Sequence, residues 1–346
     1  MRRVDNGDIP SDEASIVLVG LPGVGKSTLG VIASVSIKKR LIETDRCFST
    51  IMGMTAGDYL KTHGKDALLA QEFEVLQQIL HKNAVNSVIV VAPRTSDIPS
   101  CRNLLQRFAE QHAVIHLVRQ YEDIVQHLKA RMKPEEIKRM YDHSLQLYRS
   151  FTNYEFFVHD GGLDNRTSFA PSFLSLKGVE RDFLGFLRFI RGKSRHVSFL
   201  SPPEETDFSR ILVTPYPQHD EIPDLSAVHG IHAIQLRVDF SIVRKTQRTI
   251  LLNNISRVSA TLRASCGYPL AFAIGNAVDP LTGNLIDEEN YFAVLDHAIS
   301  LAFDYCYLDL RAPRGSIIRF MKTTATTKII ANWHQTVEPR RPTASS

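Results

Sequence analysis

Short runs of apolar residues alternate with segments of helical periodicity along the first half of the chain. Val, Ile and Leu dominate residues 15–20, 87–92 and 113–118, and such near-continuous runs predict strands buried on both faces of a parallel sheet. The segment 66–82 carries apolar side chains at the spacing of one helix face. Strands that alternate with helices predict a doubly wound parallel α/β domain that extends to about residue 190.

A second alternation of strands and helices follows the basic stretch RFIRGKSRH. Segments 246–265 and 288–303 have helical character. The predicted strands are residues 196–201, 232–240, 268–275, 305–310 and 327–334. Such β/α units predict a (β/α) barrel, but five strands cannot close its eight-stranded form. We therefore expect a partial barrel, and a chain that stops partway through a larger protein.

These patterns divide the chain into four parts. Residues 1–13 are expected to be disordered, and residues 14–190 to form the first α/β domain. Residues 191–338 are expected to form the partial barrel, and residues 339–346 a tail. The segment 202–230 is rich in Pro and Asp and is interpreted as a long surface insertion.

Composition is that of an ordinary globular protein. Of the 346 residues, 43% are hydrophobic and 23% are charged, and the formal net charge is +4. This small excess gives no support for direct nucleic-acid binding, and no run approaches the roughly 18 apolar residues of a membrane span. The four cysteines lie far apart without metal-ligand spacing, so no structural metal is expected. We interpret the chain as an intracellular protein of the nucleus, the cytoplasm or both.

The strongest chemical motif follows the first predicted strand. It reads G-x-x-x-x-G-K-S from Gly20 to Ser27, a pattern whose backbone N–H groups wrap phosphate oxygens at a helix N-terminus. Lys26 would neutralise the β- and γ-phosphates, and Ser27 would ligate Mg²⁺. The predicted site for ATP or ADP with Mg²⁺ comprises Gly20, Gly23, Val24, Gly25, Lys26, Ser27 and Thr28. A vestigial structural turn is the alternative.

Two carboxylates follow in the stretch RLIETDRCF. Glu43 and Asp45 lie two residues apart at the end of a predicted strand, so their side chains are expected to point the same way. Together they could hold a metal-bound water and an acceptor hydroxyl, because phosphoryl transfer needs an aligned acceptor as well as a nucleotide. A solvated loop edge is the other interpretation.

The first half resembles shikimate kinase. The stretches LVGLPGVGKSTLG, LIETDRCF, HGKDALLAQEFEVL, SVIVVAP and QLYRSFTNYEFFV follow one another as in that family, above all in the kinase domain of the fungal pentafunctional shikimate-pathway polypeptide. The resemblance covers roughly residues 14–190. It implies that Asp45 contacts the shikimate hydroxyl and assists its deprotonation. It also implies that Glu43 takes the place of an aspartate that supports Mg²⁺.

Departures from this family fall where it binds the substrate. Leu69 replaces an arginine that clamps the substrate carboxylate, and the stretch around residues 143–144 replaces a second one. The family's glycine triplet becomes Ala92, Pro93 and Arg94. Each lost charge-assisted bond is worth roughly 1.5–3 kcal/mol, so shikimate phosphorylation is not expected. Asp45 and Arg94 are interpreted as parts of a vestigial metabolite site.

The second half resembles type I 3-dehydroquinase, a (β/α)₈ enzyme that works through a lysine Schiff base. The element LRVDF carries much of the likeness, which spans roughly residues 195–338. Gln235 replaces the family's glutamate beside Arg237, Arg311 replaces another glutamate, and Gly275 lies near the place of an arginine. Gln235 and Arg237 are therefore assigned to a second vestigial metabolite site.

His334 matches the general-base histidine of that family, although Gln335 and Thr336 follow it instead of Asp-Phe. The Schiff-base lysine would lie on the next strand. General-base catalysis needs both groups in one pocket, so Asp45 and His334 are vestigial candidates and no catalytic residue is expected. A packed or surface histidine is the alternative for His334.

The tandem of two degenerate domains resembles the fungal quinate repressors. That resemblance implies a sensor of quinate catabolism that binds the pathway's transcription activator and takes a metabolite of the quinate or shikimate pathways as its signal. A divergent shikimate kinase, or another small-molecule kinase that uses Lys26, Asp45 and Arg94, is the main alternative. An ATP-operated switch that phosphorylates no sugar acid is a third.

Overall fold

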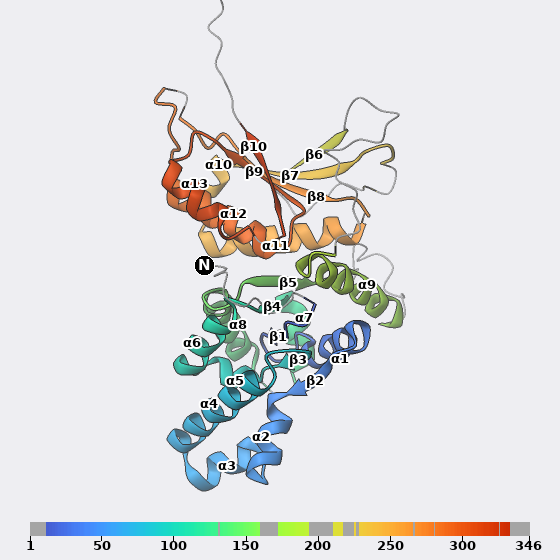
Figure 1. Cartoon of the computed structure of the whole chain (residues 1–346), viewed down its shortest axis with the longest axis vertical. Helices are drawn as coiled ribbons and strands as arrows, with labels where there is room; N and C mark the ends of the chain where they lie inside the picture. Colours follow the sequence, from blue (N-terminus) through green and yellow to red (C-terminus); the bar gives the residue numbers. More distant parts are fainter. Residues whose placement is uncertain are drawn as a thin grey trace, which may run out of the picture.

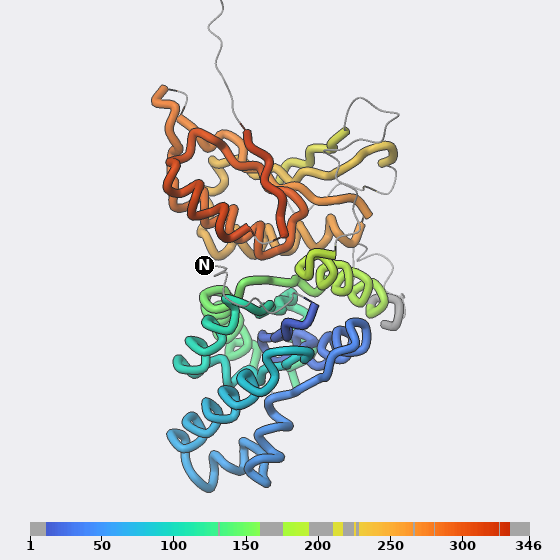
Figure 2. Tube along the Cα trace, viewed as in Figure 1, coloured from blue at the N-terminus to red at the C-terminus, as the bar shows by residue number. Residues whose placement is uncertain are grey.

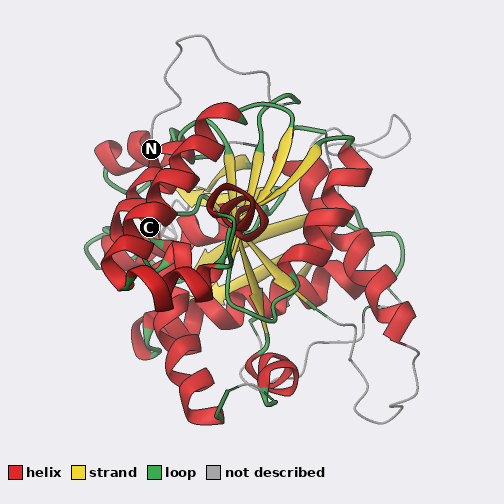
Figure 3. Cartoon of the chain, turned by 90° about the horizontal axis from the view of Figure 1, so that it is seen from below, coloured by secondary structure: helices red, strands yellow, loops and turns green. Residues whose placement is uncertain are grey.

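The computed structural model contains two parallel five-stranded sheets, one in each half of the chain (Figures 1 and 2). Helices lie on both sides of the strands (Figure 3). The described residues are 12–130, 132–159, 172–193, 210–216, 225, 228–265, 267–279, 281–324 and 326–332. Within them, no helix is long and apolar enough to cross a membrane.

The first sheet has the strand order β2-β3-β1-β4-β5. Its strands are β1 (Ile16–Val19), β2 (Arg40–Glu43), β3 (Ser87–Val90), β4 (Ala113–Arg119) and β5 (Tyr154–Val158). Every residue of β1, β3 and β5 is buried, as expected of a parallel sheet covered on both faces. The three predicted strands of the first half are confirmed as β1, β3 and β4.

Helices connect and cover these strands. They are α1 (Lys26–Ile37), α2 (Thr44–Met52), α3 (Ala56–His63), α4 (Lys65–Lys82), α5 (Pro93–Ser96), α6 (Pro99–Phe108), α7 (Tyr121–Leu128), α8 (Pro134–Arg149) and α9 (Ser172–Ile190). The predicted apolar stripe of the segment 66–82 faces the core, because Leu76 and Leu80 of α4 are buried there. The doubly wound α/β class is confirmed.

The second sheet has the order β10-β9-β8-β7-β6, and every neighbouring pair is parallel. Its strands are β6 (Ile211–Pro215), β7 (Ala233–Asp239), β8 (Leu270–Gly275), β9 (Tyr305–Asp309) and β10 (Lys328–Asn332). Its helices are α10 (Phe240–Lys245), α11 (Arg248–Ser265), α12 (Glu288–Ser300) and α13 (Arg314–Met321). The sheet is open, because β6 and β10 lie on opposite edges. A partial barrel, as predicted, is confirmed.

One prediction for the second half of the chain, the surface insertion, is wrong. The segment 202–230 was expected to be a surface insertion, but residues 211–215 form β6, which pairs with β7 along its whole length. Parallel pairing supplies the backbone partners that the run ILVTP needs, although turn-forming residues flank it. The predicted strand 196–201 lies outside the described residues.

The two halves meet where α11 packs against the edge strand β5 (Figure 1). An apolar cluster crosses this boundary and joins Val118, Leu145 and Phe157 of the first half to Ala260 of α11. An edge strand left open is a site for unwanted pairing, and a covering helix is one way to protect it. The second half therefore completes the burial of the first sheet.

A buried polar cluster lies at the same boundary, and Glu155 of β5 is at its centre. Its carboxylate accepts hydrogen bonds from Arg149 Nε (2.7 Å) and from the Ser256 hydroxyl of α11 (2.5 Å). His116 Nδ1 of β4 lies 3.3 Å from the same carboxylate, and His297 Nε2 of α12 lies 3.9 Å from it. Buried charges are tolerated only when they are paired and hydrogen-bonded, and here partners come from both halves.

Burial and neighbouring charges set the protonation of this cluster. Burial acts to raise the pKa of Glu155, but the Arg149 guanidinium and the side chains of His297 and His116 hold it well below its usual range. Burial lowers the pKa of His116, and it lowers that of His297 from 6.5 to about 4, although Glu155 opposes both shifts. An ionised Glu155 beside two neutral histidines follows at neutral pH.

Stability should therefore fall on acidification. The unfolded chain protonates His297 below about pH 6.5, whereas the folded chain resists protonation down to about pH 4. The free energy of unfolding should drop by about 2 kcal/mol between about pH 7.5 and pH 5 from this residue alone. His116 adds to the loss in the same direction, and Glu155 does so at lower pH.

Urea denaturation at the two pH values, compared with the same pair in His297→Gln, measures this contribution. The variant retains an amide donor for the Leu252 carbonyl, which lies 2.9 Å from His297 Nε2, but it cannot titrate. Its stability should depend less on pH. An equal pH dependence in the two proteins would contradict the assignment.

Candidate functional site

The G-x-x-x-x-G-K-S loop connects β1 to the N-terminus of α1, and its backbone requires glycine. A Cβ atom at Gly20 would lie 2.6 Å from the carbonyl oxygen of Leu117, and one at Gly23 would lie 3.1 Å from Cδ2 of His127. Gly25 is the left-handed residue (φ 93°) that precedes α1. These positions let the chain turn sharply and direct backbone N–H groups toward one point.

Lys26 lies across this loop. Its Nζ donates hydrogen bonds of 2.8 Å to the carbonyl oxygens of Gly20 and Leu21. Burial lowers the pKa of Lys26 to about 8, although Asp45 opposes the shift. Ser27 and Thr28 are exposed in the first turn of α1. Strand, loop, lysine and hydroxyls thus fit a nucleotide. Lys26 would lie beside its phosphates, and Ser27 would be available to Mg²⁺.

The spacing of Glu43 and Asp45 predicts two side chains that point the same way along one strand. This prediction is wrong. β2 ends at Glu43 and α2 begins at Thr44, so the two carboxylates belong to different elements. Glu43 forms an ion pair with Arg46 at 2.6 Å. Asp45 forms one with Arg94 instead. The period-two argument fails because the chain turns into a helix between the two residues.

Arg94 lies against Asp45 and a second, buried carboxylate. It starts from the first turn of α5 and bridges two carboxylates, Asp45 and Glu72, with 2.5 Å between its Nε and Glu72 Oε1. Glu72 is only 4% exposed and also accepts a hydrogen bond from the Thr95 hydroxyl. Burial lowers the pKa of Arg94, but Glu72 and Asp45 outweigh this and raise it. Asp45 is therefore already paired with a cation of the protein.

The other positions at which the sequence departs from the shikimate kinase pattern make contacts within the protein or are exposed. Leu69 packs against the core of the first half. Ala92 is buried, and its backbone N–H donates to the Thr44 hydroxyl at 2.9 Å. Ser144 is buried and donates to the Tyr141 carbonyl, whereas His143 is exposed. None of these side chains offers the bidentate cation that a carboxylate substrate favours.

The second predicted site lies at the carboxyl ends of β7, β8 and β9. The Arg237 guanidinium covers Gly275, since a Cβ atom there would lie 2.6 Å from Arg237 Nε. Arg311 binds Asp309 through two hydrogen bonds of 2.9 and 2.6 Å, and that bonding, with the charge of Asp309, raises the pKa of Arg311. Gln235 is half-buried on β7. His334 lies outside the described residues, and among those described no group of His, Cys, Asp or Glu could hold a metal ion.

Two families of enzymes match successive parts of this chain. Residues 22–161 match the family model of shikimate kinase, and residues 213–342 match that of type I 3-dehydroquinase. The chain is thus a tandem of a shikimate kinase-like and a dehydroquinase-like part, as the sequence predicted.

Similar proteins include two fungal quinate repressors. The quinate repressor protein of Emericella nidulans is 29% identical over 94% of this chain, and that of Talaromyces stipitatus is 25% identical over 93%. The chain spans 40% and 38% of the lengths of these two relatives. The pentafunctional AROM polypeptide of Schizosaccharomyces japonicus is 23% identical over 94% of this chain and 20% of its own length. The predicted resemblance to quinate repressors is confirmed.

Solved structures of shikimate kinases are also similar. The enzyme from Acinetobacter baumannii in complex with shikimate has a TM-score of 0.38 and 20% identity, and it covers 47% of this chain and 89% of its own. The enzyme from Bacteroides thetaiotaomicron has a TM-score of 0.41 and 16% identity, with 51% and 99% covered.

Sequence reasoning missed the bridge that Arg94 forms and the cluster around Glu155. Glu155 gave one signal, because it is a carboxylate within the apolar strand YEFFV, and a charge on a fully buried strand requires a partner. Its partner Ser256 is 101 positions away, so no local pattern could identify it. Glu72 gave a similar signal inside the apolar stripe of α4.

The bridge predicts a measurable stability difference between two arginines. Arg94→Ala should lower the free energy of unfolding by about 1–3 kcal/mol, because the buried Glu72 carboxylate loses a charged donor. The lower part of this range is expected, since the Arg94 side chain is 39% exposed. Arg46→Ala is the matched control, because Arg46 also pairs with a glutamate but is 84% exposed. Its loss should stay below about 0.5 kcal/mol in chemical denaturation, and equal losses would contradict the role given to Arg94.

Proposed function

We propose that this chain is a regulator of quinate catabolism, built on shikimate-pathway enzyme domains that have lost their catalytic sites. The observation that carries the proposal is the position of Arg94, which joins Asp45 to Glu72 where a kinase of this fold would receive its acceptor. A carboxylate that is already paired with an internal guanidinium is less available to a substrate hydroxyl. The chain then acts by binding rather than by phosphoryl transfer.

The relatives support a repressor that contacts protein. Two of them are named quinate repressor proteins, and in this proposal the chain shares their role. It holds the transcription activator of the quinate pathway inactive in the nucleus or cytoplasm, and a metabolite of the quinate or shikimate pathways modulates that contact. The self-paired charges of the second half, such as Arg311 with Asp309, agree with the loss of dehydroquinase chemistry as well.

Nucleotide binding at the loop from Gly20 to Thr28 is part of the proposal. The glycines with positive φ and the lysine held over the loop form a phosphate cradle. ATP or ADP with Mg²⁺ would be held there without transfer of the γ-phosphate to a sugar acid. The same cradle also favours the second candidate, a divergent shikimate kinase, because it retains the phosphate loop, the lysine and the serine that such an enzyme uses on the nucleotide.

Calorimetry and an ADP-release assay separate these two functions. We expect the purified chain to bind ADP with Mg²⁺ and to show no ADP release from ATP that depends on added shikimate or quinate. Lys26→Met should weaken ADP binding by about tenfold or more, because a charged contact to phosphate is lost. Lys61→Ala, which removes an exposed cation of α3 outside the loop, should bind as the parent does. Shikimate-dependent release that Lys26→Met abolishes would establish the kinase instead.

Expression of the quinate-catabolic genes tests the regulatory role directly. Disruption of the gene for this chain in its own host should switch those genes on without quinate in the medium. When the disrupted strain receives a gene for the Arg94→Ala variant, the quinate-catabolic genes should be repressed about as well as with the parent gene, because no catalytic step is involved. The comparison requires that the variant accumulates to the same level. Transcript levels measure both outcomes, and genes that stay silent in the disrupted strain would overturn the proposed repressor.

A further inference from the structure

The polar cluster at the boundary between the halves belongs to neither candidate site. Its members are His116, Arg149 and Glu155 from the first half and Ser256 and His297 from the second. A boundary that served only to cover an edge strand could be apolar throughout, and replacement of buried ion pairs by apolar groups often costs nothing in stability. The choice of polar groups therefore suggests a further role.

Two residues of the cluster, His116 and Glu155, lie side by side on neighbouring strands with the last residue of β1. Val19, the last residue before the phosphate loop, is the Cα partner of His116, and His116 is the Cα partner of Glu155. The next residue of β4, Leu117, directs its carbonyl oxygen against Gly20, so closely that a Cβ atom there would lie 2.6 Å away. Paired residues on β1, β4 and β5 thus connect Gly20, the first glycine of the loop, to Glu155 at the boundary.

The side chains of these paired residues have little freedom. His116 and Glu155 are each 2% exposed, and the His116 ring stacks on Tyr148 with 4.9 Å between ring centroids. The Ser256 hydroxyl has one proton, which we assign to Glu155 because the contact is short (2.5 Å) and the acceptor is charged. His297 Nε2 lies 2.9 Å from both the Ser256 hydroxyl and the Leu252 carbonyl. A shift of α11 must therefore change the bonding of Glu155.

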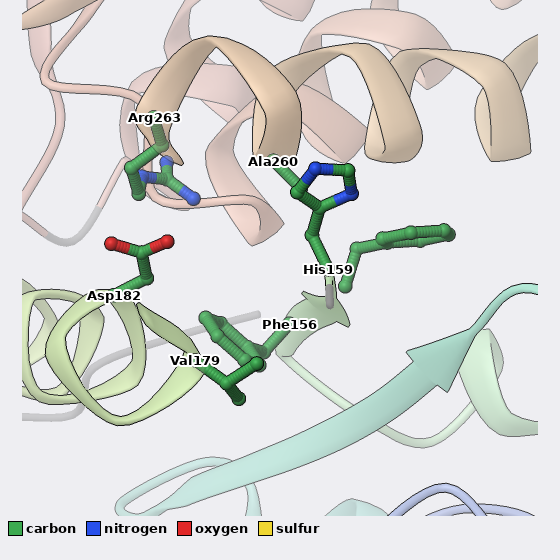
Figure 4. Close-up of a pocket in the computed structure, with 7 residues that line it drawn as sticks. Phe156, His159, Val179, Asp182, Ala260 and Arg263 are labelled. Carbon is green, nitrogen blue, oxygen red and sulfur yellow. The ribbon is translucent and has the colours of Figure 1, made fainter. Parts of the chain in front are cut away.

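Contacts between α11 and the first half are both apolar and polar: Ala260 packs against Phe157, and Thr249 accepts a hydrogen bond from Gln146. A pocket lies beside the cluster, between β5, α9 and α11, with His159, Asp182 and Arg263 around it (Figure 4). Arg263 donates to the carbonyl of Leu301 at 2.9 Å, which ties α11 to the end of α12. The Glu155 cluster adds direct hydrogen bonds to the apolar contacts between α11 and β5.

We propose that the Glu155 cluster couples the docking of the second half to the conformation of the phosphate loop. Docking of Ser256 and His297 fixes the Glu155 carboxylate, Glu155 orients His116, and β4 then holds its Leu117 carbonyl against Gly20. The loop is rigid when the halves are docked and looser when they are not. This coupling goes beyond the proposed function and does not depend on whether a nucleotide binds, since it concerns the loop itself.

Hydrogen exchange on the full chain, followed by mass spectrometry, tests the coupling. Ser256→Ala removes the hydroxyl that Glu155 accepts from. The loop peptides, residues 16–30, should then exchange about threefold faster or more, because local opening of the loop becomes easier. Residues 44–63 of α2 and α3, which lie in the same half but away from the boundary (Figure 1), should exchange at an unchanged rate.

Ser259→Ala is the matched control. Ser259 is 1% exposed and lies one turn further along α11, where its hydroxyl donates to the Ser256 carbonyl at 2.9 Å. It should leave residues 16–30 as in the parent. If Ser256→Ala does not fold, Ser256→Cys, which keeps the shape of the side chain but has only a weak S–H donor, replaces it with the same expected result. Equal exchange of the loop in parent, control and cluster variant, or faster exchange everywhere in the first half, would overturn the coupling.

Titration with ADP distinguishes this proposal from the proposed function. If the parent chain binds ADP, Ser256→Ala should bind it several-fold more weakly and Ser259→Ala should not. Equal affinities of all three would overturn the coupling. If the parent does not bind ADP, nucleotide binding fails as part of the proposed function, and the exchange experiment alone decides the coupling.

Discussion

The buried carboxylate of Glu155 is the constraint on which the arrangement of the two halves depends. An ionised carboxylate at a fully buried position is costly unless donors surround it. Among the described residues, the first half supplies Arg149 and His116, and a helix of the second half supplies Ser256. Docking in any other register would leave Glu155 with an incomplete set of partners. One charge thus selects the register of an interface that apolar contacts alone would define loosely.

The same physical rule governs the two sites. In an enzyme that acts on a sugar acid, carboxylates and guanidinium groups remain available to the substrate, and the protein tolerates the cost of leaving them unpaired. Here the charges satisfy each other: Arg94 binds Asp45 and Glu72, and Arg311 binds Asp309. Such pairing stabilises the fold and lowers the affinity for a charged ligand. This pairing is the physical basis of the proposal that the two enzyme-like parts act by binding.

Much of the architecture could be predicted because it rests on short-range patterns. Apolar runs located β1, β3, β4 and the strands β7 to β10, since a strand buried on both faces has little choice of residues. β6 was missed because Pro and Asp surround the run ILVTP, and only pairing with β7 makes it a strand. The bridge of Arg94 and the cluster around Glu155 were missed for a different reason. Both join residues that are distant in the sequence, and their geometry is a property of the assembled fold.

The phosphate loop shows why a motif is weaker information than its surroundings. A Cβ atom at Gly20 would lie 2.6 Å from the Leu117 carbonyl oxygen, and Gly23 has a φ of 84°, which residues with side chains rarely adopt. The fold itself therefore favours these two glycines, whether or not a phosphate is ever bound. The motif alone cannot distinguish a kinase from a binding protein on the same fold. The distinction lies in side chains such as Arg94, whose charge goes either to a substrate or to the protein itself, and in this chain it goes to the protein.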